Sequence, residues 1–85
     1  MEKPVRYTMH AETVILQRES SKGWIEETMR TPEWTEPDPR DPAVRRCFRA
    51  IPMRDGRILR VACVEDDVEC RVVSAFLDRD ARKPA

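Results

Sequence analysis

The chain has 85 residues, of which 40% are hydrophobic, so it can build one domain around a single modest core. Sixteen basic residues balance sixteen acidic residues, which excludes a strongly basic nucleic-acid arm and an acidic disordered tail. Three cysteines without a CxxC pair argue against a disulfide scaffold and favour a reducing compartment. We recognise no apolar run of membrane-spanning length and no signal-peptide pattern, and therefore expect a cytoplasmic protein without a membrane partner.

The first predicted element is a helix from Met9 to Arg18. Thr8 is a suitable N-cap, and Ala11, Val14 and Ile15 recur at the spacing that places apolar side chains on one helix face. The serines and glycine of residues 19–23 break this pattern because they favour caps and turns.

A second helix is expected before Pro32. Ser20 or Ser21 can cap it, and Trp24 and Ile25 begin its apolar side. Pro32 ends the helix because a residue that precedes proline is displaced from helical backbone angles.

The segment that follows is rich in proline, and after it the hydrophobic period changes from helical to two. Four prolines in residues 32–42 indicate an extended segment that cannot form a central strand. Strands are predicted from Arg45 to Met53, Arg57 to Glu65 and Val68 to Leu77, and a short strand from Val5 to Tyr7 is a further option. Asp55-Gly56 and Asp66-Asp67 are read as two-residue turns that join the three strands.

These elements predict an α+β fold in which two N-terminal helices pack on one face of a three- to four-stranded antiparallel sheet. The single domain divides into a helical part at about 8–31, a connection at 32–42, a β-meander at about 45–77 and a polar tail at 78–85. A domain this small is often marginally stable alone, so a homodimer or another partner is expected as an option.

Two-residue turns would fix which side chains share a face of the sheet. The predicted core face comprises Phe48, Ala50, Pro52, Leu59, Val61, Cys63, Cys70, Val72, Ser74 and Phe76. On the opposite face, the same register brings Arg49, Arg60 and Arg71 together from three adjacent strands. Guanidinium groups suit phosphate, so this patch is a candidate anion site, and solvated arginines on an open sheet face are the alternative.

His10 is the only histidine and is a candidate for proton transfer, although a lone histidine is more often a surface or packing residue. Cys63 and Cys70 are expected to be buried, reduced thiols on the core face. No metal-ligand spacing, phosphate loop or dinucleotide fingerprint is present, so we expect neither a metal nor a cofactor. Trp34 is expected to fold back over the edge of the core.

The order of these features resembles a small bacterial family, domain-of-unknown-function family 4258, over about residues 8–78. The matching stretches are His10-Ala11, Arg18, Gly23 to Ile25, Pro32, Arg57 to Val64 and Val72 to Phe76. The resemblance implies a unit similar to the RelE-like ribonuclease toxins, in which helices cover one sheet face and basic sheet residues contact RNA.

For this chain the resemblance implies a metal-independent endoribonuclease or RNA-binding relative, with RNA and an antitoxin-like protein as expected partners. His10 and Arg60 would then be catalytic, and Arg49 and Arg71 would bind the substrate phosphate. Ser74 would be a further position to test, although the predicted register places it on the core face. The alternative function is a non-catalytic partner-binding or regulatory module with the same fold.

Overall fold

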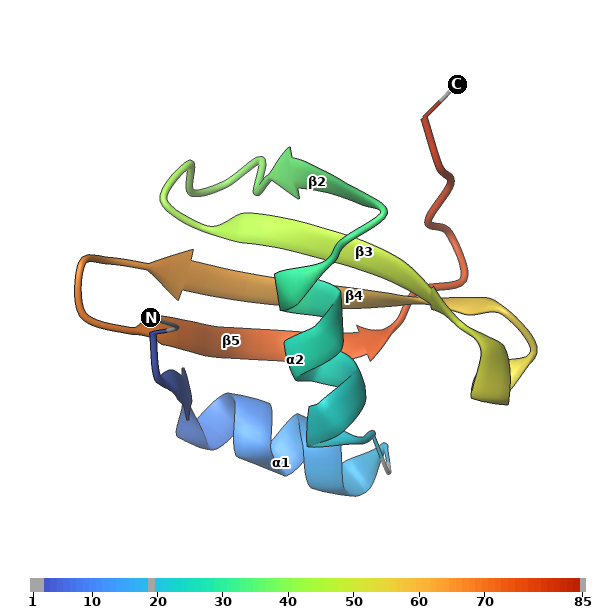
Figure 1. Ribbon diagram of the computed structural model, residues 1–85, viewed down its shortest axis with the longest axis horizontal. Helices are drawn as coiled ribbons and strands as arrows, with labels where there is room; N and C mark the ends of the chain where they lie inside the picture. Colours follow the sequence, from blue (N-terminus) through green and yellow to red (C-terminus); the bar gives the residue numbers. More distant parts are fainter. Residues whose placement is uncertain (1–2, 19, 85) are drawn as a thin grey trace.

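The computed structural model describes residues 3–18 and 20–84, and Figure 1 shows their arrangement. Residue 19, at the predicted break between the helices, and residue 85, in the predicted tail, lie outside the described residues. The elements are β1 (Val5–Tyr7), α1 (Met9–Gln17), α2 (Lys22–Arg30), β2 (Trp34–Pro37), β3 (Arg45–Ile51), a short 3₁₀ helix (Pro52–Arg54), β4 (Arg57–Glu65) and β5 (Cys70–Leu77).

The α+β class is confirmed, whereas the predicted sheet needs correction. The described residues form a five-stranded mixed sheet in the order β1-β5-β4-β3-β2, and β1 runs parallel to β5. The extra strand, β2, lies in the proline-rich segment at the edge of the sheet, where its Pro37 pairs with Arg45 of β3. Proline is tolerated there because an edge strand has one side that needs no hydrogen-bond donor.

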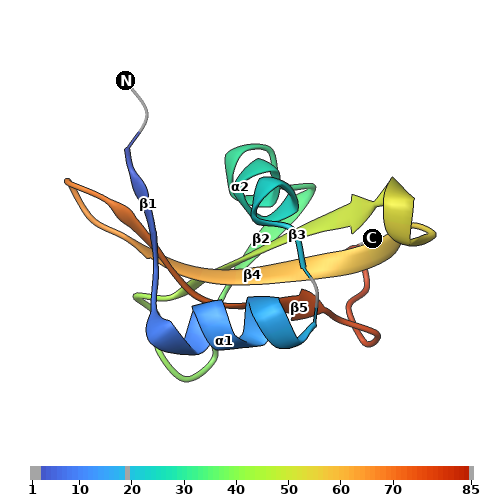
Figure 2. The ribbon, with the colours of Figure 1, turned by 90° about the horizontal axis from the view of Figure 1, so that it is seen from below.

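The two helices do not share one face, contrary to the prediction. Helix α2 packs on β3 and β4, whereas α1 lies along β5 (Figures 1 and 2). Strand β1 pairs only with Cys70–Val72, and the Thr8 amide then donates to the Val72 carbonyl at 3.0 Å as α1 begins. The helix therefore shields the part of the β5 edge that β1 leaves unpaired.

Both helix starts have the predicted capping chemistry. The Thr8 hydroxyl accepts from the Ala11 amide at 3.1 Å. The Ser21 hydroxyl accepts from the amides of Gly23 and Trp24 at 3.1 and 3.4 Å. Each contact satisfies an amide that has no partner within its own helix, and substitution of such a cap by alanine costs about 1 kcal/mol.

The first hairpin does not have the predicted two-residue turn. Strand β3 already ends at Ile51, which pairs with Arg57, and the 3₁₀ helix occupies the connection. Proline at position 52 has no N–H for the ladder, and Asp55 and Gly56 adopt φ angles of 57° and 73° to close the turn. The register differs from the predicted one by an odd number of residues. Each β3 side chain therefore lies on the opposite face from the one predicted.

The second hairpin also has a longer turn, followed by a bulge. The Asp66 carboxylate accepts from the amides of Val68 and Glu69, both at 2.8 Å. Farther along, Cys63 pairs with Val72 but Ala62 pairs with Ser74, so Val73 is the extra residue. The bulge moves Ser74 and every second residue after it away from the predicted core face.

The core lies between α2 and the sheet and extends to α1. Leu59, Val61, Cys63, Cys70 and Val72 are buried on the predicted face. Two parts of the predicted core face need correction. In β3 the core residues are Cys47 and Ile51, and not Phe48, Ala50 and Pro52. At the end of β5 they are Ala75 and Leu77, and not Ser74 and Phe76. No helix in the described ranges is long and apolar enough to cross a membrane.

Candidate nucleic-acid interface

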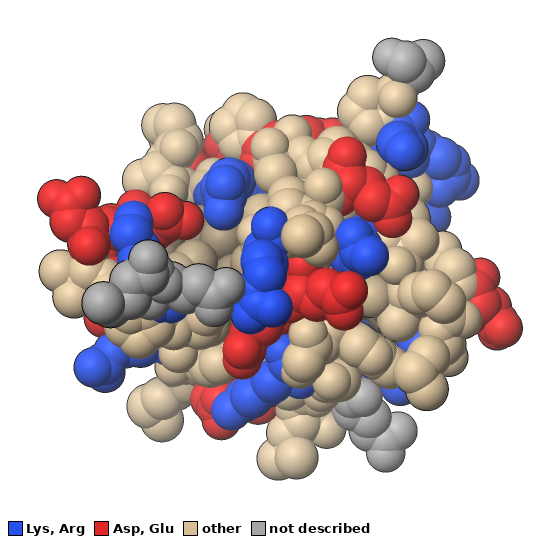
Figure 3. Space-filling view, in the orientation of Figure 1, with Lys and Arg blue, Asp and Glu red and all other residues tan. Residues whose placement is uncertain are grey.

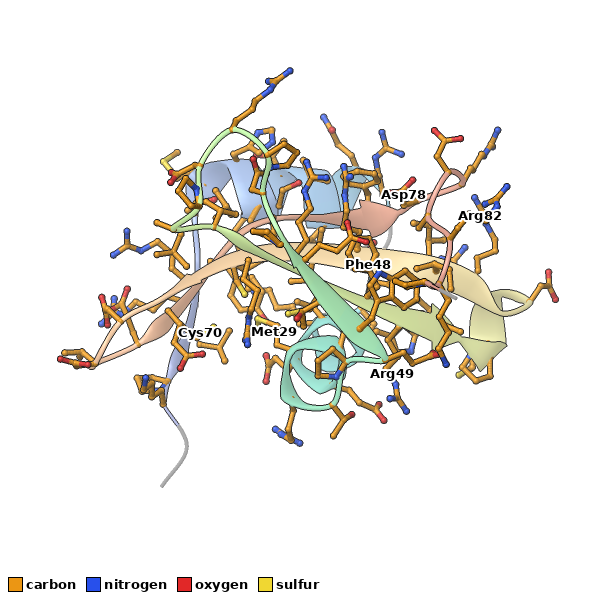
Figure 4. All side chains as sticks on the ribbon, turned by 90° about the horizontal axis from the view of Figure 1, so that it is seen from above. Met29, Phe48, Arg49, Cys70, Asp78 and Arg82 are labelled. Atoms are coloured by element: carbon orange, nitrogen blue, oxygen red, sulfur yellow. The ribbon has the colours of Figure 1, made fainter. Side chains whose placement is uncertain are left out.

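Arg49 does not join the other two arginines of the predicted patch. It is opposite Leu59, so it lies on the face that carries α2. Its Nη1 donates to the Thr31 carbonyl at 2.7 Å, and its Nη2 lies 3.5 Å from Glu27 Oε1. The structure thus places Arg49 at the C-terminal end of α2, where its guanidinium partners main-chain and carboxylate oxygens (Figure 4). Its assignment to phosphate binding stays a prediction.

Arg71 is on the face away from α2, but at a distance from Arg60. Arg71 is opposite Val64 of β4. Val64 is four residues from Arg60 along that strand, which corresponds to roughly 13 Å at the rise per residue of a strand. Its Nε and Nη2 donate to Glu69 Oε2 at 3.2 and 3.1 Å. The predicted convergence of three arginines is therefore wrong, because the predicted register was wrong.

Arg60 belongs to an aromatic row that crosses four strands. Trp34, Phe48, Arg60 and Phe76 are successive partners on β2, β3, β4 and β5. The Trp34 and Phe48 rings stack with centroids 4.6 Å apart and planes inclined by 3°, so Trp34 does fold back as predicted. The Arg60 guanidinium lies 4.3 Å from the Phe76 ring centroid, and its Nη1 lies 3.3 Å from Asp78 Oδ2.

A cleft with a volume of about 510 Å³ lies beside this row, at the end of the sheet where β5 ends and β4 begins. We call it the arginine cleft. It is lined by Arg18, Ser20, Arg54, Arg57, Phe76, Leu77, Asp78, Arg79 and Asp80. Arg60 contacts two of these lining residues, Phe76 and Asp78, and is thereby the one predicted site residue that the structure brings to the cleft.

Basic side chains outnumber acidic ones in the lining of the arginine cleft, which has four arginines against Asp78 and Asp80. Within the described part of the chain, Arg18, Arg57 and Arg79 have no carboxylate partner, and Asp78 is engaged by Arg60. Arg18 instead faces the Phe76 ring, with its guanidinium carbon 5.9 Å from the centroid. Elsewhere, on the face that carries α2, basic and acidic side chains are intermixed (Figure 3).

Local structure explains why these arginines meet although they are far apart in sequence. Arg18 caps the end of α1, and Arg54 ends the 3₁₀ helix with its guanidinium carbon 5.5 Å from the Trp24 ring centroid. Arg57 begins β4 and Arg79 follows β5. All four are at the boundaries of elements, so the periodicity of the strands gave no signal for them. The one available signal was that a basic residue recurs at each boundary.

His10 does not meet Arg60 in this structure. It is exposed in the first turn of α1, whereas Arg18, at the other end of that helix, lines the cleft. Ser74, in contrast, lies on the face away from α2 because of the bulge at Val73, and not on the core face as predicted. The catalytic assignment of His10 and Arg60 stays a prediction.

No group of three or more histidine, cysteine, aspartate or glutamate side chains within residues 3–18 and 20–84 has an arrangement that can hold a metal ion. Cys63 and Cys70 are buried as predicted, and neither they nor Cys47 forms a disulfide. Burial raises the pKa of the Cys70 thiol to about 11, so this thiol is protonated at neutral pH.

Comparison with known proteins gives one family and no relative of known function. No curated protein and no solved structure matches the chain. The family model described as "Domain of unknown function (DUF4258)" matches residues 7–77, which is most of the chain. The resemblance noted from the sequence is thus confirmed at the level of the family. The chain belongs to the DUF4258 family.

Proposed function

We propose that the protein binds RNA by holding its phosphate backbone in the arginine cleft. The observation that carries this proposal is that four arginines and two aspartates line one cleft, and that three of these arginines have no carboxylate partner among the described residues, namely Arg18, Arg57 and Arg79. Guanidinium groups are rigid, permanently charged donors that match phosphate oxygens in pairs. A cleft with an excess of arginines favours an anionic ligand that makes several contacts, as a nucleic-acid strand does.

The aromatic row supports a strand with accessible bases. Phe76 lines the cleft and is half-buried, with Arg60 on its ring, and the half-buried ring of Trp34 extends the row at the edge strand β2, where it stacks on the buried Phe48. Bases of single-stranded nucleic acid stack on aromatic rings and on arginine planes, whereas bases of a duplex are not available for this. We therefore propose single-stranded RNA as the ligand.

Because the chain resembles the RelE-like ribonuclease toxins, we further propose that it cleaves the RNA that it binds. Metal-free cleavage needs a base for the 2′-hydroxyl and cations for the charge that develops on phosphorus. Arg60 and the cleft arginines are suitable cations, and His10 is the candidate base. We put binding before cleavage because His10 and Arg18 occupy opposite ends of α1.

The test is a salt-dependent titration of labelled single-stranded RNA. Arg57→Ala/Arg79→Ala removes two exposed guanidinium groups from the cleft, and Arg6→Ala/Arg40→Ala removes the same charge from exposed positions elsewhere. Each lost phosphate contact lowers the slope of log K against log salt by about 0.7 for a single strand, so the cleft variant should lose about 1.4. The control variant should keep the wild-type slope.

The alternative, a non-catalytic module that binds a protein partner, predicts a different outcome. Wild-type protein would then show no RNA affinity at low salt, and a co-purifying antitoxin-like protein would be the partner to seek. Equal slopes in the cleft and control variants would show that RNA binds elsewhere on the surface.

A further inference from the structure

A second cavity lies at the end of the sheet opposite the arginine cleft, between α2 and the first residues of β1 and β5. Its apolar lining consists of Val5, Met29 and Cys70 (Figure 4). Cys70 is 8% exposed, and Val5 and Met29 are half-buried, so these side chains form the inner part of the cavity. We call this cavity the methionine pocket.

The inner part of the methionine pocket carries no charge. Cys70 Sγ lies 3.7 Å from Met29 Sδ, so the helix and the sheet meet there. Burial raises the pKa of the Cys70 thiol to about 11, and the thiol is therefore neutral at pH 7. An apolar group that leaves water for this part of the pocket is stabilised by the hydrophobic effect.

The volume of the pocket limits the size of a ligand. A dry cavity of about 150 Å³ holds a benzene molecule, and pockets for drug-sized ligands have about 300–1,000 Å³. The methionine pocket has a volume of about 220 Å³. It therefore has room for one aromatic ring or a short aliphatic chain that carries a small polar group.

The outer part of the pocket is charged, and basic side chains outnumber acidic ones. The basic residues are Lys3, Arg30 and Arg45, and the acidic residues are Glu26 and Glu65. Lys3 Nζ lies 2.9 Å from Glu65 Oε2, and Arg45 Nη2 lies 3.6 Å from Glu65 Oε1. One carboxylate thus faces two cations, so the group formed by Lys3, Arg45 and Glu65 has a net positive charge.

This charge favours a carboxylate on the ligand. Ammonium and guanidinium groups donate charge-assisted hydrogen bonds to carboxylate oxygens, and a single negative charge balances the excess at Lys3 and Arg45. A doubly charged phosphate would leave its second charge unmatched beside Glu65. A neutral ligand would leave the excess of positive charge as it is.

We propose that the methionine pocket binds a small monocarboxylate whose apolar body is an aromatic ring or a short aliphatic chain. The apolar body lies beside Met29 and Cys70, and the carboxylate accepts hydrogen bonds from Lys3 and Arg45. This binding does not depend on the proposed RNA binding, because the methionine pocket and the arginine cleft share no lining residue.

The test is an NMR titration of the full chain with ¹³C-labelled methionine methyl groups. The probes are phenylacetate and phenylacetamide, which have the same ring and differ in charge. The Met29 methyl signal should shift in a saturable way, whereas those of Met9 and Met53, which are 89% and 80% exposed outside the pocket, should stay in place. Phenylacetate should bind about tenfold more tightly than phenylacetamide, because hydrogen bonds between charged groups are the stronger ones.

A pair of variants tests the recognition of charge. Arg45→Gln should weaken phenylacetate binding about fivefold or more and leave phenylacetamide binding unchanged. Arg40→Gln is the matched control, because Arg40 is exposed in the loop between β2 and β3 and does not line the pocket, and it should bind both probes as the wild type does. Circular dichroism of each variant confirms that the fold is intact.

The proposal is overturned if the Met29 signal does not respond to phenylacetate, or if the Met9 and Met53 signals respond as strongly. Equal affinities of the wild type for phenylacetate and phenylacetamide would overturn it as well. The same holds if Arg45→Gln and Arg40→Gln bind phenylacetate equally tightly.

Discussion

The guanidinium of Arg60 covers the ring of Phe76 at 4.3 Å and at the same time lies 3.3 Å from the carboxylate of Asp78. Arg60 and Phe76 are cross-strand partners on β4 and β5, and Phe76 also lines the arginine cleft. The Arg60 side chain thereby contacts the aromatic ring and engages one of the two carboxylates that line the cleft with the arginines. Arg60 is thus a structural residue of the cleft wall as well as a candidate for contact with phosphate.

Arg60→Ala should destabilise the fold by about 2 kcal/mol, because it removes a cation–π contact and leaves a partly buried carboxylate without its partner. Arg71→Ala is the matched control on the same face, since the Arg71 side chain is 52% exposed and its guanidinium bonds only to Glu69 in the described chain. The control should change the free energy of unfolding by less than about 0.5 kcal/mol. Urea denaturation of both variants measures the difference, and equal values would contradict the structural role of Arg60.

Trp34→Ala should cost about 2 kcal/mol, because the indole stacks on Phe48, which is only 3% exposed. Trp34→Phe keeps an aromatic ring on Phe48 and should lose less than half of that amount. The comparison by thermal and urea unfolding separates the ring contact from the main-chain pairing of β2, which both variants retain. A similar loss in both would show that the stacking contributes little.

The free energy of unfolding should fall as the pH rises above about 10, and Tyr7 should cause part of this fall. Burial, followed by the hydrogen bond from the Tyr7 hydroxyl to Glu26 Oε2 at 2.7 Å, raises the pKa of Tyr7 above its usual value. From about pH 10 the unfolded chain loses this proton while the folded chain keeps it, so folding becomes less favourable as pH increases. At pH 7 the free energy of unfolding of Tyr7→Phe should be about 1 kcal/mol lower than that of the wild type. As the pH rises above about 10, this free energy should fall less in the variant than in the wild type. A parallel pH dependence in both proteins would contradict this.

His10→Ala tests cleavage separately from binding. If the protein cuts RNA, the variant should lose about a hundredfold or more in rate, because a proton-transfer group contributes at least that much to catalysis. Its RNA affinity and its stability should stay near those of the wild type, since His10 is exposed. A ribonuclease assay with matched affinity measurements decides this. Undiminished cleavage by the variant would exclude His10 as the base.

The fold could be predicted from the sequence wherever local chemistry decides it. Thr8 and Ser21 are caps whatever surrounds them, and the alternation of Leu59, Val61 and Cys63 identifies the buried face of β4. The β3 register could not be predicted by counting from Asp55-Gly56, because Pro52 ends the ladder earlier and a 3₁₀ helix takes up the extra residues. The incorrect register led to the incorrect prediction that Arg49 lies on the same face as Arg60 and Arg71.

The end of β5 and the cleft escaped prediction for different reasons. No residue type at Val73 marks a bulge, yet the bulge decides on which face Ser74 and Phe76 lie. The arginines of the cleft come from a helix end, a turn, a strand start and the tail, so only the tertiary structure shows that they are neighbours. Sequence patterns report periodicity within an element, whereas this site is formed between elements.

The most direct test of the account is to locate the RNA contact by NMR. In a titration of ¹⁵N-labelled protein with single-stranded RNA, the side-chain Nε–Hε signals of Arg18, Arg57 and Arg79 should shift first and most, together with the Phe76 amide. The corresponding signals of Arg6 and Arg40 should stay in place. Shifts confined to Arg49 and α2, or to Arg71, or the absence of any shift at low salt, would contradict the assignment of RNA binding to the arginine cleft.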